Sequence, residues 1–253
     1  MVFKLMLAPM EGITDASFRT LCYQNGADLT FTQIARVANL ARAKKGELGK
    51  IAIPDGTPTQ IQLSGAKVGE YEKFLSSFKP SSGFQGFNLN LGCPSPSFIR
   101  QGIGAAMIKR VVRVNEIVKL INHAGYECSL KLRLGLNKYE KEKGAYLNLI
   151  EAVNASFFVV HAKTAEQREE EPADFSVYEK CVATGKKIVA NGGIGTKSVD
   201  RLCPHLNCEA IYSTKTKEQI EELKSLGLYG AMIGRAAMEN PKIFVNLQSQ
   251  TSK

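Results

Sequence analysis

The chain has 253 residues, close to the roughly 250 of a single (β/α)8 barrel, although two ordinary domains remain possible on length alone. A hydrophobic content of 44% excludes a disordered chain, and no apolar run approaches the about 20 residues of a membrane span. Pro9 and Glu11 interrupt the first apolar stretch, so we expect no signal peptide. Six scattered cysteines predict reduced thiols and a cytoplasmic location.

Positive charge is concentrated in the first part of the chain, whose overall formal net charge is +9. Residues 1–150 hold 20 Lys+Arg against 11 Asp+Glu, whereas residues 151–253 hold 13 of each. Such an excess suits a polyanion, usually nucleic acid, although a solvated surface that keeps the protein soluble would look the same. The basic residues form two groups, Arg36, Arg42, Lys44, Lys45 and Lys50, and Arg100, Lys109, Arg110, Arg113 and Lys119.

Short apolar segments alternate with longer helical patterns along the chain. The expected strands are residues 4–8, 29–32, 60–63, 86–91, 129–134, 157–161, 187–190 and 230–233. The expected helices are residues 15–25, 68–78, 114–124, 139–153 and 217–226. Eight strand–helix units in about 250 residues favour the closed parallel sheet of an α/β TIM (β/α)8 barrel, with residues 1–253 as one catalytic domain.

Residues 196–213 do not fit this alternation. They suggest an extra strand at residues 209–212, and they contain Cys203, His205 and Cys208. These three side chains could ligate a metal, but a fourth ligand is not evident, so we expect no metal site.

Three expected strands carry polar pairs at alternate positions, namely Gln60 with Gln62, Asn88 with Asn90, and Lys131 with Arg133. Period two places each pair on one strand face, and helices cover the outside of a parallel barrel. The pairs should therefore point inward, near the mouth at the carboxyl ends of the strands. Because two buried cations need an anionic partner, the alternation predicts an anionic, hydrogen-bonding ligand there.

Glycines follow the last two barrel strands. Asn191, Gly192 and Gly193 end one strand, and Gly234 and Arg235 end the next. Glycine allows backbone N–H groups to approach a phosphate closely, and barrels commonly bind phosphate after strands seven and eight. We therefore expect a phosphate group at these two strand ends.

Two further residues are placed for chemistry. Cys93 stands in a loop after the strand that carries Asn90, and a thiol there can act as nucleophile or general acid. His161 ends another strand. The alternatives are an unreactive loop thiol and a hydrogen-bonded core histidine.

Eight segments together carry a family likeness, at residues 7–15, 60–63, 88–94, 102–107, 131–135, 160–164, 191–194 and 232–236. The first reads LAPMEGITD and is followed by Phe18 and Arg19, and the third reads NLNLGCP. In order and over nearly the whole chain, these segments resemble the tRNA-dihydrouridine synthases, FMN-dependent enzymes that reduce uridines in tRNA.

The resemblance implies an FMN site and NADPH or NADH as the reductant. It places Pro9, Met10, Gln62 and Lys131 at the flavin ring and His161 near the ring or its phosphate arm. It places Asn191, Gly192, Gly193, Gly234 and Arg235 at the phosphate. It also implies that Asn90, Arg133 and Lys163 contact the extruded uracil. Hydride would pass from flavin N5 to uracil C6, and Cys93 would protonate C5.

The chain departs from the family pattern at two points. Ala162 and Lys163 replace a usual Gly-Arg, and residues 168–171 are unusually acidic. The family's usual C-terminal helical domain is expected to be absent, which predicts weak, strongly salt-dependent tRNA binding by this chain alone. The contact with tRNA would then rest on the basic residues of the first 150, on a protein partner, or on a smaller contact area. Two alternatives remain, a dihydroorotate dehydrogenase-like flavin oxidoreductase acting on a free pyrimidine and a non-catalytic flavin- or RNA-binding barrel.

Overall fold

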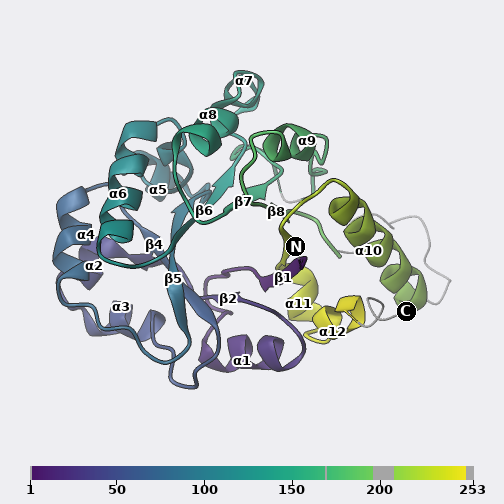
Figure 1. Cartoon of the computed structure of the whole chain (residues 1–253), viewed down its shortest axis with the longest axis horizontal. Coiled ribbons are helices and arrows are strands. Elements are labelled where there is room, and N and C mark those ends of the chain that lie inside the picture. Colours follow the sequence, from purple (N-terminus) through teal and green to yellow (C-terminus); the bar gives the residue numbers. More distant parts are fainter. Residues whose placement is uncertain (1, 169, 196–207, 249–253) are drawn as a thin grey trace.

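The structure, a computed structural model, describes residues 2–168, 170–195 and 208–248, the last range with side chains from residue 215 onward. A parallel sheet curls into a barrel with helices around it (Figure 1). The strand order is β1-β9-β8-β7-β6-β5-β4-β2, and a parallel bridge from Met6 in β1 to Leu29 beside β2 closes the ring. The predicted TIM-barrel fold is confirmed.

All eight predicted strands are confirmed within one or two residues at each end. They are β1 (Lys4–Leu7), β2 (Thr30–Phe31), β4 (Thr59–Ser64), β5 (Phe84–Leu91), β6 (Cys128–Arg133), β7 (Phe158–His161), β8 (Ile188–Asn191) and β9 (Gly230–Ile233). A short strand that the sequence did not predict, β3 (Ala35–Arg36), pairs with the carboxyl end of β4, whereas β2 pairs with its amino end. The second barrel position is therefore one interrupted strand.

The helices along the first half of the chain are α1 (Ala16–Gln24), α2 (Val37–Leu40), α3 (Lys45–Lys50), α4 (Val68–Leu75), α5 (Pro96–Arg100), the 3-10 turn η1 (Gly104–Met107) and α6 (Val111–His123). Those that follow are α7 (Lys138–Glu142), α8 (Ala145–Ala152), α9 (Val177–Val182), α10 (Cys208–Ser225), α11 (Arg235–Glu239) and α12 (Ile243–Gln248). The helix expected at 139–153 is split into α7 and α8, because Gly144 adopts a left-handed φ of +69°.

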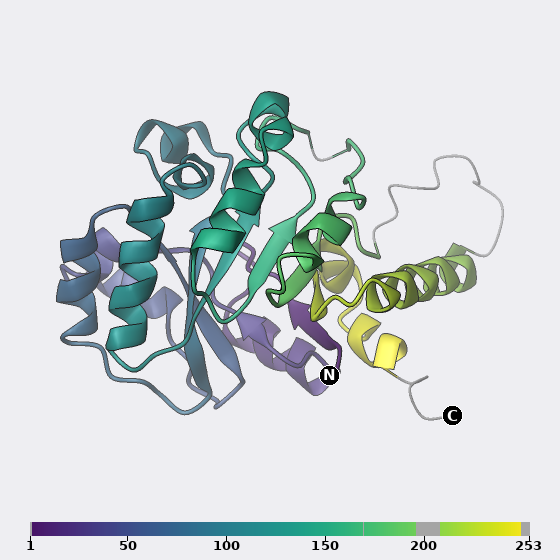
Figure 2. The same ribbon diagram turned by 45° about the horizontal axis from the view of Figure 1, so that its top comes forward.

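The extra strand expected at residues 209–212 is wrong, because these residues lie in the first turns of α10. A short apolar run cannot by itself distinguish a strand from a helix, and the run continues into many lysines, glutamates and glutamines, which are good helix formers. Figure 2 shows α10 extending away from the barrel. Cys203 and His205 lie outside the described residues, as does the side chain of Cys208.

The barrel interior has two chemically different halves. Toward β1, β2, β7, β8 and β9 it is filled by Met6, Ala8, Phe31, Phe157, Val159, Val189 and Met232. Toward β4, β5 and β6 it is filled by buried polar side chains, Gln60, Gln62, Asn88, Asn90 and Ser129. This polar half lies behind the loop that carries Cys93.

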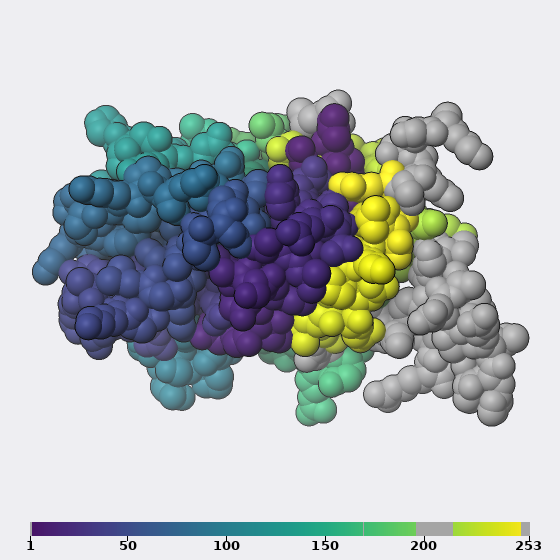
Figure 3. All heavy atoms as spheres, turned by 90° about the horizontal axis from the view of Figure 1, so that it is seen from below, coloured from purple at the N-terminus to yellow at the C-terminus, as the bar shows by residue number. Residues whose placement is uncertain are grey.

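The two ends of the described chain meet beside the barrel. β1 pairs with β9, and the Gln248 side chain in α12 donates a hydrogen bond of 2.7 Å to the Gly26 carbonyl. Figure 3 shows the N-terminal residues against the last described helices. No helix among the described residues has the length and apolar character that crossing a membrane requires.

Candidate active site at the barrel mouth

A cavity of about 400 Å³ lies at the carboxyl ends of the strands. Most of the residues that the sequence assigned to the site line it, namely Met10, Lys131, Arg133, His161, Lys163, Asn191, Gly192, Gly193, Gly234 and Arg235. Four assigned residues do not contact the cavity directly, namely Pro9, Gln62, Asn90 and Cys93. The cavity is lined, however, by Ala8, which precedes Pro9, and by Pro94, which follows Cys93. The structure therefore brings together residues that are more than 200 positions apart in the chain.

The cavity is cationic. Lys131, Arg133, Lys163, Arg168 and Arg235 line it, and no aspartate or glutamate does so among the described residues. Lys131 has no hydrogen-bond or ion-pair partner in the described part of the chain. Burial, followed by the nearby Arg133 guanidinium, lowers the pKa of Lys131 to about 7. A bound anion would remove this penalty, so the cavity is built for an anionic ligand.

His161 is held as a neutral imidazole in the same wall. Burial lowers its pKa to about 2, and the surrounding cations, Lys131 and Arg133 foremost, add to this effect. Gly192 packs directly on the ring, since a β-carbon there would lie 2.6 Å from His161 Cδ2. At φ +113° this position also favours glycine. His161 can therefore donate or accept a hydrogen bond, but it does not supply charge.

The strand ends expected to hold phosphate are tied together by Asn191. Its side-chain amide donates to the Met232 carbonyl over 2.9 Å, which links β8 to β9. Gly193 has φ +71°, and Gly234 lies against Met10, where an added β-carbon would be 3.5 Å from the sulfur. Gly193 and Gly234 both line the cavity here, and Arg235 stands beside them.

Hydrogen bonds within the loop after β1 hold Met10 at the cavity. The Thr14 hydroxyl donates to the Met10 carbonyl over 3.0 Å and lies 3.1 Å from the Met10 N–H, which donates to it. Buried Arg19 in α1 donates to the Thr14 carbonyl over 2.9 Å. No role was expected for Thr14 or Arg19 from the sequence, although Thr14 stands in the first motif and Arg19 follows it. Their role is to support this loop.

Cys93 stands in a loop that is held from two sides. Its N–H donates to Asn90 Oδ1 over 3.0 Å, and its carbonyl accepts from the Ala105 N–H over 3.0 Å. Its thiol is partly exposed, whereas Cys22, Cys128 and Cys181 are buried, with pKa values raised by burial. Among the cysteines whose side chains are described, Cys93 is thus the one accessible to a reagent or a substrate.

Arg133 joins the loops on either side of its strand. Its Nε donates to the Gly92 carbonyl over 3.0 Å, and Nη1 donates to the Thr164 carbonyl over 2.7 Å. Lys163 is buried and donates to the Arg168 carbonyl over 3.2 Å. Both cations therefore shape the mouth as well as line it.

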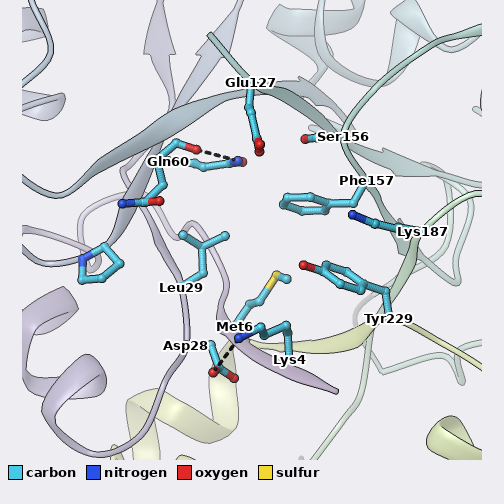
Figure 4. A pocket seen from close by; sticks show the side chains of 12 residues that line it. Lys4, Met6, Asp28, Leu29, Gln60, Glu127, Ser156, Phe157, Lys187 and Tyr229 are labelled. Carbon is cyan, nitrogen blue, oxygen red and sulfur yellow. Dashed lines mark hydrogen bonds and ion pairs between the residues drawn. The ribbon is translucent and has the colours of Figure 1, made fainter. Parts of the chain in front are cut away.

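One sequence expectation about the polar pairs is wrong. Gln60 does not lie near the mouth but lines a second cavity of about 300 Å³ at the amino ends of the strands. Figure 4 shows Gln60 in that wall, with Met6, Phe157 and Tyr229. Gln62, Asn88 and Asn90 lie buried between the two cavities and bond to one another. The polar strand residues thus need no ligand to satisfy them, except for Lys131.

The two groups of basic residues meet near the Cys93 loop. The Arg36 guanidinium lies 4.8 Å from the ring centroid of Phe98 in α5. Its Nη1 donates to Gln101, next to Arg100, over 3.2 Å. Arg36 and Gln101 are 65 positions apart in the chain, and this contact brings the first residues of the two groups close together beside the Cys93 loop.

Comparison with known proteins identifies the family. The family model for "Dihydrouridine synthase (Dus)" matches residues 6–253. A protein named tRNA-dihydrouridine synthase B from Pseudomonas putida is 25% identical over 96% of this chain and 67% of its own length. A probable tRNA-dihydrouridine synthase from Helicobacter pylori is 28% identical over 98% of this chain and 71% of its own.

Solved structures support the fold. An old yellow enzyme homologue from Zymomonas mobilis superposes with a TM-score of 0.60 at 10% identity, covering 99% of this chain and 88% of its own. A 3-hexulose-6-phosphate synthase from Salmonella typhimurium superposes with a TM-score of 0.51 at 14% identity, covering 98% of this chain and 99% of its own. These likenesses are of fold alone. Since the family model covers nearly the whole sequence, the chain belongs to the dihydrouridine synthase family.

Proposed function

We propose that the protein is a tRNA-dihydrouridine synthase that uses FMN, reduced by NADPH or NADH, and acts in the cytoplasm. The observation that carries the proposal is the cavity at the mouth, which gathers five lysine and arginine residues without a carboxylate among the described residues. The relatives from Pseudomonas putida and Helicobacter pylori are named for this activity, and one from Coprinopsis cinerea is named an NAD(P)(+) enzyme.

The residues present fit FMN. Lys131, which has no partner among the described residues, suits the N1–O2 edge of the flavin, which becomes anionic on reduction, and Met10 offers a soft apolar surface to a ring. Asn191, Gly192, Gly193, Gly234 and Arg235 would hold the phosphate, with Pro9 and His161 completing the site. The amide of Gln62, which was expected at the flavin, is already bonded to Asn88 and Asn90. When bound, the flavin supplies the hydride that reduces the uracil C5–C6 bond.

Cys93 is proposed as the general acid that donates a proton to C5 of the uracil. Its thiol is accessible, and its neighbour Pro94 lines the cavity. The cations Arg133 and Lys163 would face the uracil O4, where negative charge develops before C5 is protonated. Asn90 would contribute its remaining N–H, because its oxygen already accepts from the Cys93 loop.

The substrate must present its uridine outside the stacked bases, as other enzymes that act on a base require. Basic residues of these two groups that lie near the mouth, such as Arg36 and Arg100, would hold the tRNA backbone around that base. The proposed partner is therefore tRNA, bound chiefly through phosphate contacts.

The test uses the purified full chain, FMN, NADPH and unmodified tRNA transcripts, with dihydrouridine measured by mass spectrometry. Dihydrouridine at one or a few positions is expected. Free orotate and uridine serve as competing substrates. Reduction of a free pyrimidine without tRNA modification would instead support a dihydroorotate dehydrogenase-like enzyme, and flavin binding without any turnover would support a non-catalytic barrel.

A further inference from the structure

Buried side chains form a continuous hydrogen-bonded path behind the Cys93 loop. The Cys93 N–H donates to Asn90 Oδ1 over 3.0 Å, and Asn90 Nδ2 donates to Gln62 Oε1 over 3.0 Å. Gln62 Nε2 then donates to Asn88 Oδ1 over 2.7 Å. Each of these amides is at most 8% exposed. The path thus starts at the backbone of the proposed general acid and runs into the barrel.

The path continues away from the mouth through a serine. Asn88 Nδ2 donates to Ser129 Oγ over 2.7 Å, and Ser129 Oγ donates to Gln60 Oε1 over 2.5 Å. Gln60 Nε2 ends the path on the Gln85 carbonyl, 3.1 Å away, at the second cavity (Figure 4). We call Asn90, Gln62, Asn88, Ser129 and Gln60 the interior chain.

The Gln85 carbonyl, at the end of the interior chain away from the mouth, determines which group donates in every hydrogen bond of the interior chain. The Gln85 carbonyl can only accept, so Gln60 must turn its amide nitrogen toward it and its oxygen toward Ser129. Ser129 has one proton, which it must give to that oxygen. Its lone pairs then require a donor from Asn88, so the Asn88 oxygen is left to face Gln62.

The Cys93 end of the interior chain independently requires the same order of donors and acceptors. The Cys93 N–H can only donate, so Asn90 must face it with oxygen and turn its amide nitrogen toward Gln62. Gln62 therefore accepts from Asn90 and donates to Asn88, which agrees with the order required from below. Reversing any one amide would set two donors or two acceptors against each other at one or both of its contacts.

We propose that the interior chain holds Cys93 in position, and that Ser129 is the positioning residue on which the order of its hydrogen bonds depends. This inference rests on the proposed function only in naming Cys93 as the general acid. Ser129 lies on β6, is fully buried, and does not line the cavity. A hydroxyl is needed there because the position must accept from one amide and donate to the next.

Ser129→Ala breaks the interior chain in the middle. The Asn88 nitrogen and the Gln60 oxygen would lose their partner, and Asn88 would be free to turn. Gln62 and Asn90 would then hold the Cys93 N–H less firmly. We expect the alkylation rate of Cys93, followed at its own peptide by mass spectrometry, to rise about tenfold, roughly the effect of one buried hydrogen bond.

The matched control is Thr59→Val, which removes another fully buried hydroxyl on a barrel strand. Thr59 Oγ1 donates to the Thr57 carbonyl over 2.8 Å and lies 2.8 Å from Thr30 Oγ1, outside the interior chain. The alkylation rate should stay within about twofold of the original protein in this variant. Ser129→Thr keeps the hydroxyl and should restore the slow rate.

The enzymatic readout separates positioning from a general loss of structure. In Ser129→Ala, kcat for dihydrouridine formation should fall about tenfold, while reduction of the bound flavin by NADPH, which does not use Cys93, stays unchanged. If Ser129→Ala does not fold, Ser129→Cys conserves the volume with a much weaker donor and should shift both rates in the same direction.

An alkylation rate in both Ser129→Ala and Ser129→Cys that equals that of Thr59→Val overturns the proposal. So does failure of Ser129→Thr to restore the slow rate in a folded protein. The alkylation measurement needs no tRNA and no turnover. A protein that forms no dihydrouridine would therefore refute the proposed function, while the role of Ser129 would still be decided by the thiol kinetics.

Discussion

Gly104 lies so close to Cys93 that a β-carbon at residue 104 would fall 2.8 Å from the Cys93 carbonyl oxygen. Gly104 also has φ +62°, in the left-handed region. The turn η1 therefore supports the Cys93 loop from one side, while Asn90 supports it from the other. The position of the thiol depends on backbone contacts that a single methyl group would disturb.

Gly104→Ala should cost about 1–2 kcal/mol of folding free energy through backbone strain and lower dihydrouridine formation by at least about tenfold through displacement of Cys93. Gly125→Ala is the control, because Gly125 has φ +86° but nothing within 4 Å of its added β-carbon. It should lose similar stability and keep its activity. Denaturant unfolding and the tRNA assay measure the two effects, and equal loss of activity in both variants would contradict this account.

Cys93→Ala should lower dihydrouridine formation by about 100-fold or more, the usual contribution of a general acid. Binding of FMN and its reduction by NADPH should not change, since neither step requires the thiol. Absorbance of the flavin during anaerobic NADPH addition follows the first half-reaction, and mass spectrometry of tRNA follows the second. A variant with normal tRNA modification would remove Cys93 from the mechanism.

Most strands were predictable because they are short apolar runs, and parallel barrels bury both faces of their strands. The three strands with polar pairs were predictable because polar and apolar residues alternate along them. The interruption between β2 and β3 was not, because β3 has only two residues, Ala35 and Arg36. The start of α10 was misread for a related reason, since a few apolar residues such as Ile211 and Tyr212 fit either period.

Part of the site was predictable because some residue types have few roles inside a barrel. A lysine there indicates an anionic partner. Lys131 does lie in the cavity without a partner among the described residues. The amides could not be placed in this way, because Gln60 and Asn88 bond equally well to a ligand or to each other. Ser129, with its small side chain in an apolar strand, gave no signal that it joins the two.

Lys131 should make the stability of the cofactor-free protein depend on pH. Its pKa is about 7 when folded, against about 10.4 in an unfolded chain, so between these values the unfolded state binds more protons. Stability should therefore rise as pH increases from 7 to 10, and the penalty should be present in full below pH 7.

Lys131→Met should flatten this dependence and raise the melting temperature at pH 7 by about 5 °C, because the variant lacks the Lys131 ammonium. The same variant should bind FMN more weakly, since the anion loses its partner. Melting curves from pH 6 to 10 and FMN titration measure the two effects. A slope that persists unchanged in the variant would show that other groups cause it.

Binding of tRNA should weaken steeply with salt, and Arg100 should contribute to that dependence. Arg100 is exposed at the end of α5, beside the Cys93 loop, and it has no partner in the described part of the chain. Each phosphate contact adds roughly one unit to the slope of log K against log salt, so Arg100→Gln should reduce that slope by about one.

Lys73→Gln is the control, because Lys73 is also exposed but lies in the last turn of α4, which runs away from the mouth. Filter binding between 50 and 200 mM salt, a range over which such contacts lose most of their affinity, measures both slopes. Equal slopes for the original protein and Arg100→Gln would place the tRNA elsewhere on the surface.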